Sequence, residues 1–439
     1  MKIIYSILLI QVFLFGKGWA QNLYFPPTNP NAFWDTLSPT SLGWCTEKTD
    51  SLYQYLEAEN TKAFLVLSKG KIVLEKYFGT FTADSSWYWA SAGKTLTSFL
   101  IGKAAEENLL KLSDSSSRFL GSGWSSLTPA QERQITIRHH LTMTTGLNDN
   151  VPDDDCTLPS CLQFLTNPGS RWAYHNAPYT LLEKVVENAS NQSYNAYTQT
   201  RLKNQTGITG AWFQSGFNNV FVSRARSMAR FGLLALNKFN WNGTALLQDT
   251  AFIRQSTQSS QNLNLSYGYL WWLNGKSSYM APTVPFPLPG PISPDAPSDL
   301  YAAIGKNGQI LAVVPSQNLV LVRMGNSSSS QSVPYAFLNE IWKYFSKVLC
   351  TTTSLTSASK PPSYLLYPNP ALNELVLETV GQHITDVQIL DSQGRKLQAD
   401  WALAESGIIK IQLGALPAGI FSLAVCDGAG RVQWKRFIH

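Results

Sequence analysis

The sequence is poor in charged residues. Asp, Glu, Lys and Arg make up 14% of its 439 residues, against roughly 25% in an average soluble protein. The 34 basic and 28 acidic residues are spread along the chain and give a net charge of +6, without the basic stripe that nucleic-acid binding requires. Hydrophobic residues make up 44%, enough to form a core. We therefore exclude a nucleic-acid-binding role and a disordered chain.

Long hydrophobic runs are also missing, with one exception at the N-terminus. Residues 3–15 are mainly apolar and follow Lys2, but this run is shorter than the roughly 20 residues that span a membrane. The small residues Gly18 and Ala20 suit signal-peptidase cleavage before Gln21. We therefore expect residues 1–20 to be a signal peptide and the mature chain to contain no transmembrane segment.

Cysteine is scarce, and the count of five is odd. In an exported protein this count permits two disulfides and leaves at least one cysteine outside them. Cys156 and Cys161 are close enough in sequence to form one bridge. Cys45 and Cys350 would form the other if the helices predicted beside them are antiparallel neighbours, which leaves Cys426. The alternative, that all five are small buried apolar residues, stays open at this stage.

The composition changes near residue 350 and divides the chain. Residues 351–364 are mainly Ser, Thr, Lys and Pro, have little to bury, and are typical of a linker. In residues 365–439, short runs that alternate apolar and polar residues are separated by turn sequences, which predicts a small all-β sandwich. Residues 21–350 form the large domain.

The large domain has strand patterns at both ends and helical patterns between them. Residues 63–67 and 72–78 flank a Gly-containing turn and predict a hairpin, and strand patterns return between residues 300 and 324. Helical spacing of apolar residues begins at residue 91. This order favours an α+β fold whose antiparallel sheet is completed by N- and C-terminal segments. Seven prolines in residues 282–297 predict a loop without regular structure.

The histidine motifs of common hydrolases are absent. The five histidines accompany no G-x-S-x-G elbow and form no H-E-x-x-H pair, so a Ser-His-Asp hydrolase or a zinc enzyme fits poorly. Ser91 and Lys94 instead lie three residues apart at the start of a predicted helix, where they share a face. A serine is a weak nucleophile until a base takes its proton, and a lysine is a base only if burial or another cation lowers its pKa.

Two further motifs follow in the chain, Tyr174-His175-Asn176 and Lys306-Asn307-Gly308-Gln309. With Ser91 and Lys94 they resemble the serine β-lactamase and penicillin-binding protein superfamily, whose signatures are S-x-x-K, Y-x-N and K-T-G or a variant. Other stretches are similar to the branch that holds class C β-lactamases, family VIII esterases, D-amino-acid peptidases and 6-aminohexanoate-dimer hydrolase: residues 25–44, 135–147, 225–232 and 267–272. The resemblance implies a β-lactamase/transpeptidase-like fold, an antiparallel sheet flanked by helices with a helical subdomain, over roughly residues 25–350.

The resemblance also implies a role for each motif residue. Ser91 would be the acylated nucleophile, and Lys94 its base or proton relay. Tyr174 would be the second proton-transfer group, which in class C relatives also helps to activate the deacylating water. Asn176 would orient the substrate amide or the lysine. Lys306 would lower the pKa values of Lys94 and Tyr174 and meet a substrate carboxylate.

The third motif would also supply part of the oxyanion hole. The backbone N–H groups of Ser91 and Gln309 would form that hole, and Gly308 is grouped with Lys306 and Asn176 as substrate-binding. Asn307 stands where the family has Thr, a departure that concerns β-lactam recognition more than acyl transfer.

Two other clusters have simpler interpretations. Trp87, Tyr88 and Trp89 would line an acyl pocket, although such dense aromatics usually belong to a core. The acidic residues Asp149 and 153–155 lack the spacing of a calcium loop, and a solvated loop beside the site is the better interpretation. We expect no metal and no cofactor.

The tail resembles the C-terminal sorting domain of type IX secretion substrates. The resemblance rests on four stretches: residues 367–370, 387–395, 416–421 and 435–436. It implies passage through the periplasm and the outer membrane, and the type IX secretion machinery as a partner. A carbohydrate-binding or adhesive module is the alternative.

These observations together predict an exported serine hydrolase that forms an acyl-enzyme on Ser91 with a small ester or amide, as an esterase, short-amide hydrolase, D-peptidase or β-lactamase. The alternative is a catalytically silent protein of the same fold that binds peptidoglycan fragments.

Overall fold

The computed structural model describes residues 23–327, 333–350, 365–379, 384–391, 395–405, 407–414, 416–427 and 432–439. The expected signal peptide, residues 1–20, and the expected linker, residues 351–364, lie outside the described residues. Within the described part of the chain, no helix has the length and apolar character needed to cross a membrane.

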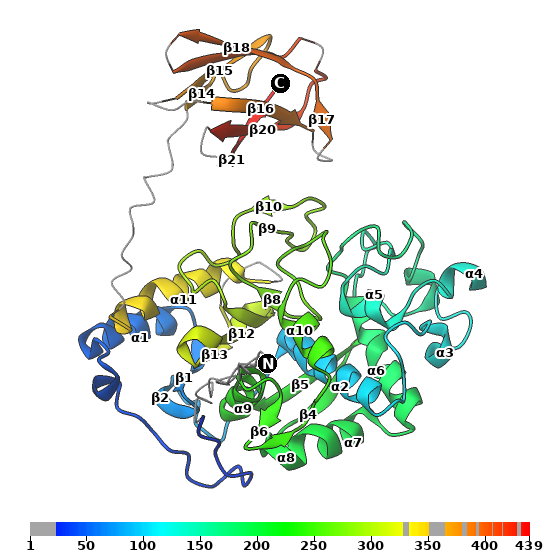
Figure 1. The fold of residues 1–439 in the computed structure, drawn as a ribbon, viewed down its shortest axis with the longest axis vertical. Coiled ribbons are helices and arrows are strands. Elements are labelled where there is room, and N and C mark those ends of the chain that lie inside the picture. The colour runs from blue at the N-terminus through cyan, green and yellow to red at the C-terminus, as the bar shows by residue number, and fades with distance from the viewer. Residues whose placement is uncertain are drawn as a thin grey trace, which may run out of the picture.

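A six-stranded antiparallel sheet forms the centre of the large domain (Figure 1). In spatial order its strands are β2 (Lys71–Tyr77), β1 (Thr61–Ser68), β13 (Leu319–Gly325), β12 (Gln309–Val314), β11 (Tyr301–Gly305) and β8 (Trp272–Leu273). Every residue of β12 and β13 is buried, which explains their nearly continuous apolar sequence. Because β1 pairs with β13, N- and C-terminal segments complete one sheet, and this sequence prediction is confirmed.

Helices cover the sheet (Figure 1). α1 (Thr49–Ala58) packs against α11 (Tyr335–Val348), and α9 (Ala225–Leu236) packs against β12 and β13. Gly232 permits this close approach of α9, because a β-carbon there would lie 2.5 Å from a methyl group of Val320.

The expected helical subdomain lies beside the sheet (Figure 1). Its two longest helices, α2 (Lys94–Glu106) and α6 (Asn176–Ser190), pack against each other, and ten of the thirteen residues of α2 are buried. A small antiparallel sheet adjoins them, in the order β3 (Ser86–Tyr88), β5 (Asn218–Arg224), β4 (Ala211–Ser215). The other elements are α3 (Ser117–Leu120), α4 (Pro129–Glu132), α5 (Ile137–Leu141), α7 (Tyr194–Thr198), α8 (Asn204–Thr206), α10 (Thr250–Thr257), β6 (Asn240–Trp241) and β7 (Thr244–Ala245).

The proline-rich segment contains one short strand that the sequence does not predict. Leu288–Pro289 (β10) pairs with Ser278–Tyr279 (β9). A proline is tolerated there because the ribbon has only two strands, so one side of each strand needs no hydrogen-bond donor.

Two disulfides join cysteines as the sequence predicts. Cys45 precedes α1 and is bonded to Cys350 after α11, with Cα atoms 5.3 Å apart. Cys156 is bonded to Cys161, with Cα atoms 5.9 Å apart. The fifth cysteine, Cys426, lies in the C-terminal tail.

The tail forms two four-stranded antiparallel sheets around one apolar core. Leu375 and Ile411 of one sheet and Val387 and Leu423 of the other belong to this core, so the predicted β-sandwich is confirmed. Its strands are β14 (Leu365–Tyr367), β15 (Glu374–Glu378), β19 (Ile408–Gln412) and β18 (Asp400–Glu405), then β17 (Lys396–Leu397), β16 (Ile384–Leu390), β20 (Ile420–Asp427) and β21 (Val432–Ile438).

Candidate active site

Ser91 and Lys94 meet at the start of α2. Ser91 lies in a 3₁₀ turn, Ala90–Gly93, and Lys94 is the first residue of α2. This continuous helical backbone places both side chains on one face, and Lys94 Nζ donates a hydrogen bond to Ser91 Oγ at 3.1 Å. Lys94 is only 3% exposed. Ser91 and Lys94 therefore lie in contact, as their spacing in the sequence predicts, and the lysine is buried.

Burial lowers the pKa of Lys94 to about 7, while the nearby carboxylates of Asp155 and Asp154 oppose this shift. The aromatic rings of Tyr179 and Tyr174 lie 4.0 Å and 5.2 Å from Lys94 Nζ and contribute to its removal from water. A substantial fraction of the amine is neutral near pH 7 and can accept a proton. The expectation that Lys306 lowers this pKa is wrong, because the Lys306 side chain is exposed and burial is what lowers it.

Asn176 holds the lysine from the other side. It is the first residue of α6, and its Oδ1 accepts a hydrogen bond from Lys94 Nζ at 2.8 Å. Its Nδ2 donates to Asp154 Oδ2 at 3.4 Å. Of the two roles expected for Asn176, the geometry matches orientation of the lysine.

The ring of Tyr174 lies beside Lys94, but the pKa of its phenol is not lowered. Its hydroxyl is buried and interacts with the Ser91 side chain. Burial raises the pKa of Tyr174 well above its usual value of 10.0, although its contact with Ser91 opposes the shift. The expectation of a lowered pKa is therefore wrong, because the loss of water on burial outweighs the effects that would lower it. A proton-bearing hydroxyl can serve as a donor.

An aromatic cluster fixes the Tyr174 ring. The ring centroid lies 5.7 Å from that of Trp272, 6.4 Å from that of Tyr267 and 6.4 Å from that of Trp172. Sequence analysis did not name these residues as parts of the site, although Tyr267 and Trp272 lie in a stretch that carries the family resemblance.

The third motif forms the turn between β11 and β12. Lys306 borders the cavity that contains Ser91. Gly308 is buried at φ +78°, where a β-carbon would lie 2.6 Å from the Arg323 guanidinium. Gln309 is fully buried, and its side chain forms hydrogen bonds with the backbone of Gly325 at 2.6 and 3.1 Å.

Gly308 and Gln309 therefore do not border the cavity, and the positions predicted for them are wrong. The chain reverses at residues 306–308, so Gln309 already belongs to the next strand and pairs with Gly305. The backbone of Gly305, on the β11 side of this turn, packs against the nucleophile, because a β-carbon on this residue would lie 3.0 Å from the backbone nitrogen of Ser91.

A cavity of about 170 Å³ contains these groups. Its walls include the predicted residues Ser91, Lys94, Tyr174, Asn176 and Lys306. Sequence analysis missed the other walls: Ala90, Asp155, Tyr179, Ser215, Asn218, Asn219 and Val220. The acidic loop at residues 153–155 was expected beside the site, but its Asp155 lies in the wall. The last four residues belong to or adjoin the β4–β5 hairpin, and nothing in their sequence indicates a site.

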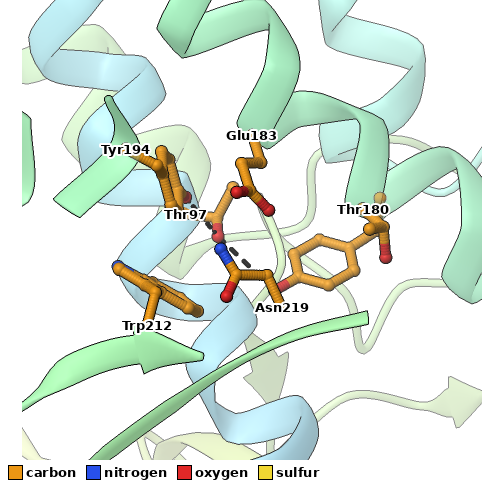
Figure 2. Close-up of a pocket in the computed structure, with 7 residues that line it drawn as sticks. Thr97, Thr180, Glu183, Tyr194, Trp212 and Asn219 are labelled. Carbon is orange, nitrogen blue, oxygen red and sulfur yellow. Dashed lines mark hydrogen bonds between the residues drawn. The ribbon is translucent and has the colours of Figure 1, made fainter. Parts of the chain in front are cut away.

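A second, much smaller cavity shares the lining residues Tyr179 and Asn219 with the first. Figure 2 shows Thr97, Glu183, Tyr194, Trp212 and Asn219 around it, and its volume of about 10 Å³ corresponds to about one water molecule. The Tyr194 hydroxyl donates to Thr97 Oγ1 at 2.8 Å. Asn219 borders both cavities, so this polar cluster supports one wall of the larger cavity.

Comparison with known families agrees with this geometry. Residues 54–340 match the family model described as Beta-lactamase, and the chain belongs to this family. Residues 365–439 match the secretion system C-terminal sorting domain, which indicates export to the cell surface or the medium. The family and the fold support a hydrolase of this superfamily.

Relatives among curated proteins are distant. An uncharacterised protein of Alkalihalophilus pseudofirmus is 23% identical over 317 residues, which cover 64% of this chain and 87% of that protein. Protein flp of Staphylococcus aureus is 26% identical over 172 residues, 35% of this chain, and the match spans about a third (32%) of the length of flp.

Solved structures share the fold. A protein assigned as a 6-aminohexanoate-dimer hydrolase from Bacillus anthracis has a TM-score of 0.54 at 18% identity, with 73% of this chain and 88% of that one covered. A protein assigned as a β-lactamase from Bacteroides dorei has a TM-score of 0.55 at 15% identity, with coverages of 70% and 99%. A penicillin-binding protein homologue from Caulobacter crescentus has a TM-score of 0.53 at 12% identity, with coverages of 68% and 97%.

Proposed function

We propose that this protein is an exported serine hydrolase that cleaves a small ester or amide through an acyl-enzyme on Ser91. The observation that carries the proposal is the hydrogen bond of 3.1 Å between Ser91 Oγ and the Nζ of a buried lysine. Burial gives this amine a pKa of about 7, so it can take the serine proton without a histidine.

Acylation follows from this arrangement. The Ser91 oxygen attacks the substrate carbonyl carbon, a C–O bond forms, and the hydroxyl proton passes to Lys94. The carbonyl oxygen becomes an oxyanion. The bond to the leaving group then breaks, and the Tyr174 hydroxyl, which keeps its proton because burial raises its pKa, protonates the departing amine or alcohol. Lys94 returns a proton to Tyr174 and is neutral again.

The oxyanion needs two backbone donors. Ser91 N–H supplies one, as the sequence predicts. We assign the other to Lys306 N–H in place of Gln309, because Gly305 packs against Ser91 and Lys306, the next residue, borders the cavity.

Deacylation reverses the same proton transfers. Water attacks the acyl carbon, and its proton passes to Lys94 or Tyr174. The bond between the acyl carbon and Ser91 Oγ then breaks as the serine takes a proton back from this pair. The carboxylic acid leaves, and the enzyme returns to its starting state.

The test compares wild type with Ser91→Ala on p-nitrophenyl butyrate, nitrocefin and a D-Ala-D-Ala peptide, with detection of the acyl-enzyme by intact mass. Ser98→Ala is a matched control, since Ser98 is another buried serine of α2 and lies outside the cavity. Turnover by wild type and Ser98→Ala together with its loss in Ser91→Ala supports the proposal. Equal turnover in all three proteins overturns the role of Ser91.

Export by the type IX machinery belongs to the same proposal. The N-terminal signal peptide would direct passage into the periplasm, and residues 365–439 would then direct passage through the outer membrane. Deletion of residues 365–439 should leave the enzyme in the periplasm, and unchanged export of this variant would contradict the assignment. A silent binding protein is less well supported, since nothing about a sensor requires a neutral lysine beside Ser91.

A further inference from the structure

We propose that Tyr179 is a positioning residue of the reaction, whose ring face directs the lone pair of the neutral Lys94 amine towards Ser91 and keeps water away from that lone pair. The inference rests on the proposed function, in which Lys94 is the base. Tyr179 lies outside the three motifs on which the sequence analysis of the site depends.

Tyr179 meets Lys94 because two packed helices place matching residues opposite each other. Lys94 and Thr97 lie three residues apart in α2, and Asn176 and Tyr179 lie three residues apart in α6, so each pair shares a helix face. Asn176 Oδ1 lies 2.8 Å from Lys94 Nζ, and the centroid of the Tyr179 ring lies 4.0 Å from the same nitrogen. One turn further along α2, Thr97 Oγ1 donates to the Tyr179 oxygen at 3.5 Å.

The Tyr179 ring also fills space beside the amine. Its side chain is 7% exposed, and it borders both the Ser91 cavity and the smaller cavity next to Thr97. A smaller side chain at this position would therefore enlarge both cavities. Water enters such a space when polar groups are there to bind it.

The parts of Asn176 and Tyr179 that face Lys94 can only accept a hydrogen. Asn176 presents its Oδ1, because its Nδ2 donates to Asp154 Oδ2 at 3.4 Å, and the face of an aromatic ring accepts N–H groups. A neutral amine has two N–H groups and one lone pair. When the two hydrogens point to Asn176 and to the ring, the lone pair is left for the Ser91 hydroxyl.

The same arrangement fits the protonated amine that proton transfer produces. The third N–H of the ammonium then donates to Ser91 Oγ, as in the hydrogen bond of 3.1 Å. The ring face attracts the new positive charge. Lys94 can therefore take and return the proton without any movement of Asn176 or Tyr179.

A water molecule in place of the ring would act differently. Water donates as well as accepts, so it would compete with Ser91 for the lone pair. It would also solvate the ammonium form, and burial is the main cause of the lowered pKa of Lys94. The charges of Asp155 and Asp154 already raise this pKa, and the Lys306 side chain, which borders the cavity, is exposed. Loss of the ring to water should therefore move the pKa towards the ordinary value of 10.5.

The test separates the ring of Tyr179 from its hydroxyl. Tyr179→Phe keeps the ring, Tyr179→Leu substitutes an apolar side chain that accepts no hydrogen, and Tyr179→Ala opens the space to water. For each variant we measure the pH dependence of kcat/KM for p-nitrophenyl butyrate, corrected for the folded fraction. The pKa of Lys94 is measured separately by NMR, from the lysine ε-carbon resonance that Lys94→Met lacks.

Tyr197→Leu and Tyr197→Ala are the matched controls. Tyr197 is a fully buried tyrosine with the Arg201 guanidinium 5.3 Å from its ring centroid, and it lies outside the Ser91 cavity. These variants remove a buried ring and a cation contact of the same kind. After correction for the folded fraction, they should keep the activity and the Lys94 pKa of wild type.

We expect Tyr179→Phe to stay within about threefold of wild type, because the lost hydrogen bond is long. Tyr179→Leu should lower kcat/KM by about tenfold or more at pH values above the midpoint. Tyr179→Ala should in addition raise the pKa of Lys94. Wild-type activity in Tyr179→Leu, an equal loss in Tyr179→Phe, or an unchanged Lys94 pKa in Tyr179→Ala overturns the inference. The NMR measurement needs no turnover, so a failure of this inference is distinguishable from a failure of the proposed hydrolysis.

Discussion

The guanidinium of Arg323 donates a hydrogen bond of 2.7 Å to the backbone oxygen of Asn307, from a position on β13 with no exposed surface. It also donates to the backbone oxygens of Gly308 at 3.1 Å and Glu59 at 2.6 Å. One buried cation thus holds the turn that brings Lys306 to the cavity.

Arg323→Met should disturb both stability and catalysis. The variant leaves the buried backbone oxygen of Gly308 without this donor, which we expect to lower the free energy of unfolding by about 1–3 kcal/mol. The freed turn should also lower kcat/KM for p-nitrophenyl butyrate after correction for the folded fraction. Arg118→Met is the control, because Arg118 is a 59% exposed partner of Asp114 and its loss should change stability by less than about 1 kcal/mol. Full activity of folded Arg323→Met would contradict a positioning role.

The pH dependence of kcat/KM should report the pKa of Lys94. Only the neutral amine accepts the Ser91 proton, so activity should rise with pH with a midpoint near 7, the value to which burial lowers the pKa. Because burial raises the pKa of Tyr174, no loss from this phenol is expected up to about pH 10. In Asp155→Asn the midpoint should fall, since the Asp155 charge raises the pKa of Lys94. A midpoint near 10 would contradict the role of Lys94 as the base.

Stability should also depend on pH through Lys94. Its pKa in the folded protein, about 7, is below the model value of 10.5, so between these values the unfolded chain binds more protons. Stability contributed by this group therefore rises with pH across that window. Lys94→Met, although inactive, should unfold at a higher temperature than wild type, with the largest difference below about pH 7 and a smaller one near pH 10. A difference in Tm that is independent of pH would contradict this account.

Gly305→Ala should block acylation. A β-carbon at this position would lie 2.5 Å from the backbone oxygen of Trp89 and 3.0 Å from the backbone nitrogen of Ser91, so the strand must move away from the nucleophile. We expect kcat/KM to fall by about 100-fold or more, as for the loss of an oxyanion donor. Gly93→Ala is the control, because Gly93 lies in the turn that carries Ser91 and its β-carbon would have ordinary contacts of 3.4 Å with Trp212. Equal activity of the two variants would rule out the Gly305–Lys306 backbone as part of the oxyanion site.

The two disulfides should have different effects when removed. Replacement of Cys45 and Cys350 by serine opens a loop with a sequence separation of 305 and should lower Tm, with a loss of about 2–5 kcal/mol, while kcat stays close to wild type. Replacement of Cys156 and Cys161 by serine opens a loop with a sequence separation of only 5, so it should lower Tm less. It should lower kcat/KM for p-nitrophenyl butyrate, because it releases the residue after Asp155, which borders the cavity. Identical changes in both double variants would contradict this division.

The sequence predicts the reacting side chains of this site better than it predicts the residues that line the cavity around them. Ser91 and Lys94 could be found because a separation of three residues on a helix determines their proximity. Gln309 was misplaced because the order of residues does not show where a strand reverses, and here Asn307 at φ +62° makes the turn before it. The sequence leaves burial and a neighbouring cation open as causes of a lowered Lys94 pKa, and it cannot decide between them because burial depends on the whole fold. Ser215 and Asn218 are ordinary hairpin residues in sequence and become cavity walls only when β4 and β5 pack beside α2 and α6.

The bond between Cys45 and Cys350 also bears on what happens after export. It ties the end of α11 to the beginning of α1, and the predicted linker starts one residue later. A protease that trims the sorting domain can therefore cut anywhere in that linker without loosening the last helix. After such a cut, the disulfide would still close residues 45–350 into a covalent ring, and only the few residues after Cys350 would differ between cut sites.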